Sequence, residues 1–137
     1  MYLTYTAETK YQHIENPTLH QLTNALETMN KEDRRYLKLE DDVINLTIAC
    51  DSQGERFLLT YKNQQHTRFG ETQCLLESSI IIKDDEPDSV FFFAPNGEQH
   101  SRHLGETVSK ENAIRVATHI FEYYKPPADA MWDVYLY

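Results

Sequence analysis

The chain has 137 residues, of which 40% are hydrophobic and 12% aromatic, so its composition supports one folded domain and excludes a globally disordered chain. Its 13 basic and 22 acidic side chains give a formal net charge of -9, which disfavours direct nucleic-acid binding because phosphate backbones are repelled. A basic protein partner fits this charge better, although many proteins are acidic only for solubility.

The sequence lacks the patterns of a signal peptide, a membrane span and a disulfide framework, and this predicts the location of the protein. The first residues carry no basic lead and no signal-length apolar run, and no stretch approaches the roughly 20 apolar residues of a membrane span. Cys50 and Cys74 are too few for a disulfide framework or a zinc site, so we expect buried thiols. We therefore expect a single cytoplasmic domain, residues 1–137, without membrane contact.

The N-terminal part of the sequence predicts a strand and then a helix. Residues 2–6 alternate weakly between apolar and polar side chains, as a strand does. Asn16 followed by Pro17 predicts an N-cap and a first helical residue. The apolar stripe of this helix consists of Leu19, Leu22, Ala25, Leu26 and Met29.

After Tyr36 the hydrophobic period changes to two, which predicts strands. The alternating apolar sets are Leu37 and Leu39, then Ile44, Leu46 and Ile48, then Phe57, Leu59 and Tyr61. The turn-forming residues 51–54 predict a hairpin between the last two sets. Residues 62–72 are polar and predict a loop or a frayed crossing.

Further strands are expected in the middle of the chain. Residues 75–76 and 80–82 are strand candidates. Residues 90–93 are apolar on both alternating faces, which predicts a central strand covered on each side, unless one face meets a partner. The turn residues 95–97 lead into 98–104 and predict a second hairpin.

A capped amphipathic helix and a final strand are expected at the C-terminal end. Ser109 is a natural N-cap, and the two prolines at 126–127 end the helix. Its apolar stripe consists of Ala113, Val116, Ala117, Ile120 and Tyr124, joined by Ile114 and Phe121. Residues 131–137 predict a last strand, in which Trp132 is expected to be buried, with an interface anchor as the alternative.

Strands joined by hairpins imply a mainly antiparallel sheet. The fold class that we expect is therefore α+β. The sheet should have about six to seven strands, and the N-terminal and C-terminal helices should pack against it as a layer.

The sequence forms no recognised catalytic or cofactor motif. Its four glycines are scattered, so neither a dinucleotide fingerprint nor a phosphate-binding loop can be built, and no cofactor is expected. His100 and His103 would lie on opposite faces of a strand, so no metal site is expected there, and His119 is expected to be a satisfied residue at the core boundary. We expect that the chain is not an enzyme, although a small hydrolase using His100 or His103 with a neighbouring carboxylate stays open.

Two short connections beside predicted strands concentrate seven carboxylates. These side chains are Glu40, Asp41 and Asp42 in one connection, and Asp84, Asp85, Glu86 and Asp88 in the other. They have two interpretations. Charged loops protect sheet edges from unwanted pairing. Alternatively, the carboxylates mimic phosphates and bind the cationic substrate groove of a partner enzyme.

The C-terminal part of the chain resembles the type 1 immunity proteins of bacterial polymorphic toxin systems. The matching residues are Ser109, Glu111, Ala113, Ala117, Phe121, Pro127, Trp132 and Asp133, in a pattern of helix, proline and tryptophan between about 108 and 133. Weaker matches precede it in family order, at 16–19, 37–39, 57–61 and 97–109. The chain departs from the family at Tyr124 and Lys125, where members often place a glycine between helix and proline.

The resemblance implies a cytoplasmic inhibitor that acts in interbacterial competition. Such a protein binds a cognate secreted toxin, with a nucleic-acid deaminase as one possible kind, and blocks the mouth of its active site. The resemblance does not identify the toxin, because one scaffold can serve unrelated partners. An adaptor or structural domain whose protein partner is not a toxin remains the alternative.

Overall fold

The computed structural model describes residues 1–7, 10–30, 35–51, 54–63, 71–76, 89–93, 99–103 and 107–136. Two helices are present in this part of the chain, α1 (Leu19–Glu27) and α2 (Lys110–Tyr123). The strands are β1 (Tyr2–Ala7), β2 (Lys10–Glu15), β3 (Tyr36–Glu40), β4 (Ile44–Cys50), β5 (Arg56–Asn63), β6 (Glu71–Leu76), β7 (Ser89–Phe93), β8 (Gln99–His103), β9 (Val108–Ser109) and β10 (Met131–Leu136). The expected α+β class is confirmed.

The large sheet is antiparallel throughout its described pairs. Its strand order is β10-β6-β5-β4-β3-β1-β2, and the two-residue strand β9 pairs with β5 as an eighth member. Among the described residues, β2 and β10 therefore form the two edges. Strands β7 and β8 pair with each other as a separate hairpin, and the described residues give them no further strand partner.

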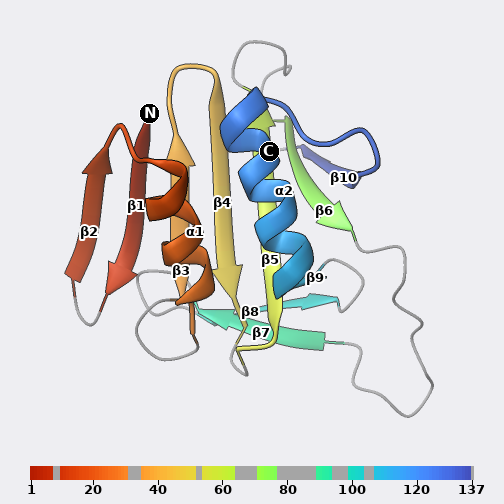
Figure 1. Cartoon of the computed structure of the whole chain (residues 1–137). Helices are drawn as coiled ribbons and strands as arrows, with labels where there is room; N and C mark the ends of the chain where they lie inside the picture. Colours follow the sequence, from red (N-terminus) through yellow and green to blue (C-terminus); the bar gives the residue numbers. More distant parts are fainter. Residues whose placement is uncertain are drawn as a thin grey trace.

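Both helices lie on the same face of the large sheet, as Figure 1 shows. The strands direct alternate side chains toward them, so in β4 Ile44, Leu46 and Ile48 are fully buried while the residues between are only half-buried. Leu22 and Leu26 of α1 and the α2 stripe complete this core. Within the described part of the chain, no helix lies over the opposite face of the sheet.

The start of α1 differs from the sequence expectation by two residues. Thr18 is the N-cap, and it forms a reciprocal capping box with Gln21, with backbone-to-side-chain distances of 3.1 and 2.9 Å. Asn16 instead has a positive φ of 51°, and its N–H donates to the Met1 carbonyl at 2.8 Å. Asparagine tolerates this left-handed conformation, so Asn16 ends β2 instead of starting the helix.

Helix α2 begins as predicted and ends in an unexpected way. Ser109 is the N-cap, and its hydroxyl accepts from the Asn112 N–H at 3.2 Å. At the other end Tyr124 has a φ of 59°, so a non-glycine residue occupies the left-handed position that follows many helices. Tyr124 is 43% exposed, so its predicted place in the buried stripe is wrong.

Most predicted strands are present, but their pairing could not be read from the hydrophobic pattern. Strand β2 was not predicted, because its exposed residues show no apolar alternation. Residues 90–93 lie in β7, which among the described residues pairs with β8 alone, so no described pairing makes them a central strand, and the coverage of their two faces stays a prediction. The hairpin connecting these strands is confirmed, whereas residues 80–82 and 95–97 lie outside the described residues.

The expected last strand is confirmed as β10. It pairs with β6 over its whole length, and the backbone of Trp132 lies opposite Leu75. Burial of the Trp132 side chain stays a prediction. Within the described part of the chain, neither helix is long and apolar enough to cross a membrane.

Candidate protein-binding surface

The first acidic connection is the turn between β3 and β4. The Asp41 carboxylate accepts hydrogen bonds from the Val43 and Ile44 N–H groups at 2.7 and 2.9 Å, and the Asp41 N–H donates to the Ile44 carbonyl at 3.0 Å. An aspartate that binds the backbone two and three residues ahead stabilises a tight turn. Asp41 therefore has a structural role in this hairpin.

The two neighbours of Asp41 differ in how available their charge is. Glu40 forms an ion pair with Lys38 at 3.2 Å, and both side chains are about one third exposed. Asp42 is exposed and has no hydrogen bond or ion pair within the described residues. Of this predicted cluster, Asp42 is the carboxylate that a cationic partner can reach without breaking an internal contact.

The second acidic connection contains Asp84, Asp85, Glu86 and Asp88. These four residues lie outside the described residues, so their position relative to Asp42 is not established. Their assignment to a partner-binding site stays a prediction.

The register of β1 brings other residues together on the sheet face opposite the helices. Tyr2 pairs with Glu15 of β2 on one side and with Glu40 of β3 on the other. Residues paired across antiparallel strands have their side chains about 5 Å apart on the same face. An aromatic ring therefore stands between two carboxylates in one row across the sheet.

A second row and a third row on the same face add further rings. Thr4 pairs with His13, and Thr6 pairs with Tyr11. The Tyr36 N–H donates to the Thr6 hydroxyl at 3.3 Å, which places the start of β3 beside the same row. We call the set Tyr2, Tyr11, His13 and Tyr36 the tyrosine patch.

Contacts within the tyrosine patch hold its rings in place. The Tyr2 and His13 rings are stacked, with centroids 5.2 Å apart and an interplanar angle of 18°. His13 Nδ1 lies 3.0 Å from the Thr4 hydroxyl oxygen. Burial raises the pKa of the Tyr36 phenol; Lys38 opposes this shift, whereas Tyr11 and Glu40 add to it. The Tyr36 phenol is therefore neutral at physiological pH.

The tyrosine patch is accessible to a partner. Tyr2 is 40% exposed and Tyr11 is 55% exposed. Sequence reasoning missed it because the prediction followed apolar stripes that face the core. The signal that could have found it is the polar alternation of Tyr11, His13 and Glu15, two residues apart, directly after the strand containing Tyr2.

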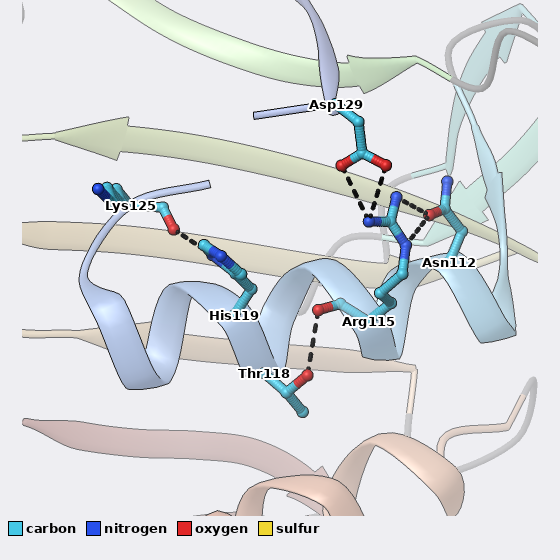
Figure 2. Close-up of polar contacts among 6 residues, drawn as sticks. All are labelled: Asn112, Arg115, Thr118, His119, Lys125 and Asp129. Carbon is cyan, nitrogen blue, oxygen red and sulfur yellow. Dashed lines mark hydrogen bonds and ion pairs between the residues drawn. The ribbon is translucent and has the colours of Figure 1, made fainter. Parts of the chain in front are cut away.

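The exposed side of α2 carries a different set of polar contacts, which Figure 2 shows. Arg115 binds the Asp129 carboxylate at 3.1 and 3.3 Å and the Asn112 amide oxygen at 2.8 and 3.1 Å. A surface pocket of about 240 Å³ beside them is lined by Ser109, Glu111, Asn112 and Arg115. Because these side chains cap the helix or tie it to the segment before β10, the contacts are structural.

The histidines considered for chemistry occupy separate places. His119 Nδ1 lies 2.8 Å from the Lys125 carbonyl oxygen, so the prediction of a satisfied boundary residue is confirmed. His100 and His103 lie on β8, where their backbones pair with Phe92 and Ser89. Among the described residues, no group of three or more histidine, cysteine, aspartate or glutamate side chains is arranged to hold a metal ion.

Cys50 is a free thiol that is completely buried, as predicted. Burial raises its pKa to about 12, with a smaller contribution from Asp51. A thiol with this pKa is almost wholly protonated at physiological pH and is a poor nucleophile.

Comparison with known proteins gives no relative for this chain. No family model, curated protein or solved structure matches it.

Proposed function

We propose that this chain is an immunity protein that binds a cognate secreted bacterial toxin and blocks its active site. It performs no chemistry on the toxin. The proposal follows from the resemblance to the type 1 immunity family between about 108 and 133, together with the charge of -9. It places the protein in the cytoplasm, where the toxin would act.

The single observation that supports this proposal best is the tyrosine patch on a sheet face that neither helix covers. Exposed tyrosines are enriched where proteins bind one another, because the ring supplies contact area and the hydroxyl supplies a hydrogen bond. A rigid antiparallel sheet can present such a face without rearrangement. Binding and occlusion need no more than a preformed surface of this kind.

The acidic connections support the same proposal through charge. A toxin that acts on nucleic acid needs a cationic groove for the phosphates of its substrate. Carboxylates at Asp42, and in the prediction at 84–88, can occupy that groove and speed the encounter of the two proteins. The partner is then a basic protein, with no contribution from direct nucleic-acid or membrane binding.

The test is co-expression with the effector encoded beside the gene. We expect cells producing that effector to survive only when the chain is also present, and we expect the two proteins to co-purify as a complex. A matched control is the same chain with Tyr2→Thr and Tyr11→Thr, checked by circular dichroism for an intact fold. Death of cells that contain both proteins, or turnover of a small molecule by the purified chain, would exclude the proposal.

A further inference from the structure

The proposed function leaves open which surface the partner contacts and which of its side chains are bound there. Tyr2 and Tyr11 are 40% and 55% exposed on the face opposite the helices. Strand β2 is an edge of the large sheet among the described residues and β1 lies next to it, as Figure 1 shows. The patch is therefore reachable both from the open face and from the side.

The patch is organised before any partner arrives. Tyr2 stacks on His13 at 5.2 Å, and His13 is held by the Thr4 hydroxyl at 3.0 Å. Rings that are already fixed lose little conformational entropy on binding. A partner side chain that lies flat on Tyr2 therefore meets a ring that is already held in place.

The charge beside the rings is negative on balance and favours a cation, because two carboxylates outweigh Lys38, which pairs with Thr4 on the same face. Glu15 and Glu40 flank Tyr2 in the strand register. Glu15 is exposed and has no partner within the described residues, whereas Glu40 shares its charge with Lys38. The planar guanidinium group of arginine stacks on an aromatic face and binds a carboxylate through two parallel hydrogen bonds. The ammonium group of lysine is not planar and cannot form this paired arrangement.

We propose that the tyrosine patch, with Glu15 and Glu40, is the docking surface for arginine side chains of a basic protein partner. Only the identity of the partner rests on the function proposed above. Under that function, the partner is the toxin. Stacked rings on a sheet can also bind single-stranded nucleic acid. The charge of -9 favours the basic protein instead.

The first experiment needs no toxin. The ¹⁵N-labelled chain is titrated with a hexa-arginine peptide, and separately with a hexa-lysine peptide and a single-stranded DNA 12-mer. We expect the largest amide shifts at Tyr2, Tyr11, His13 and Glu15, and tighter binding of the arginine peptide than of the lysine peptide.

Two variants test whether the side chains are responsible. Tyr2→Thr combined with Tyr11→Thr removes both rings but keeps strand-forming residues, and Glu15→Gln removes the flanking charge. We expect each to weaken arginine-peptide binding at least about fivefold. Tyr123→Gln is the matched control, because Tyr123 is 60% exposed and contacts His119 at 4.7 Å on α2, so it repeats the Tyr–His pair elsewhere.

The surface assignment is overturned if the peptide shifts lie outside the patch, if the variants bind as the unmodified chain does, or if the DNA binds the patch more tightly than the peptide. The toxin complex separates this proposal from the function. If the chain protects cells and both the double tyrosine variant and Glu15→Gln bind the toxin unchanged, the docking surface is wrong and the function stands. If the patch binds arginine as expected but the chain protects against no toxin, the function is wrong and the surface stands.

Discussion

At the scale of single residues, two neighbouring polar side chains at the end of β4 are buried. Asp51 is 3% exposed, and its carboxylate accepts from the Glu55 and Arg56 N–H groups at 2.8 and 3.0 Å. Cys50 beside it is fully buried. The sequence predicted a turn at 51–54, but the side-chain role of Asp51 depends on the backbone positions of residues four and five ahead of it.

Replacing Asp51 should destabilise the fold more than replacing other acidic residues. Asp51→Ala leaves two backbone donors without their acceptor, and we expect a loss of about 2 to 3 kcal/mol in the free energy of unfolding. Urea denaturation measures this quantity. Asp42→Ala is the control and should change it by less than about 0.5 kcal/mol. Equal effects at the two sites would contradict the structural role of Asp51.

The Cys50 thiol should make stability depend on alkaline pH. Its pKa is raised from 9.0 to about 12, so the unfolded chain ionises first and the thiol's contribution to stability is lost as pH rises from about 9 toward 12. Between pH 9 and pH 10.5 we expect the unfolding free energy to fall by about 1.5 kcal/mol more than in Cys50→Ala. Parallel curves for the two proteins would show that Cys50 does not cause the loss.

At the scale of elements, the helix ends show what local sequence determines. Ser109 caps α2 as predicted, because the preference of serine for this position depends only on the first turn of the helix. The cap of α1 was misplaced because Asn16, also a good capping residue, is used for the chain reversal after β2. Asn16 and Thr18 have the same local preference for the N-cap position. Only the pairing of β1 with β2 decides which of them caps the helix.

The end of α2 offers a stabilising substitution. Tyr124 has a φ of 59°, where a side chain with a Cβ costs about 1 kcal/mol relative to glycine, and it is 43% exposed. Tyr124→Gly should raise the unfolding free energy by about 0.5 to 1 kcal/mol and Tm by about 2 to 4 °C. Calorimetry checks this, with Tyr123→Gly as control: it lies inside the helix and should lower Tm. Lower Tm for both variants would contradict the assigned C-cap geometry.

At the scale of the whole molecule, the fold separates packing from recognition. The helices and the inward side chains of the sheet form the core, whereas the opposite face carries polar and aromatic side chains in cross-strand rows. The net charge of -9 acts on a partner at long range. Association rates are therefore expected to respond to both salt and the position of a charge.

Under the proposed function, reversing one carboxylate should slow toxin association only where the toxin docks. Asp42→Lys and Glu55→Lys change the net charge equally, but they lie at opposite ends of β4, about 20 Å apart. We expect the first to lower the association rate about fivefold and the second less than twofold, with the difference shrinking at 0.5 M salt. Stopped-flow measurements decide this. Equal slowing by both would show that only net charge matters.

The sequence by itself determined the α+β class, most strands, most of the apolar stripe of each helix and the Ser109 cap, because these depend on local periodicity and on the chemistry of the first helical turn. The tertiary structure decided the edge position of β2, the separate β7–β8 hairpin and the turn-forming role of Asp41. It also decided the tyrosine patch, because Tyr2, Tyr11 and Tyr36 become neighbours only through strand register. Register depends on which strands pair and on the geometry of the turns between them, and the apolar pattern of a single strand contains neither.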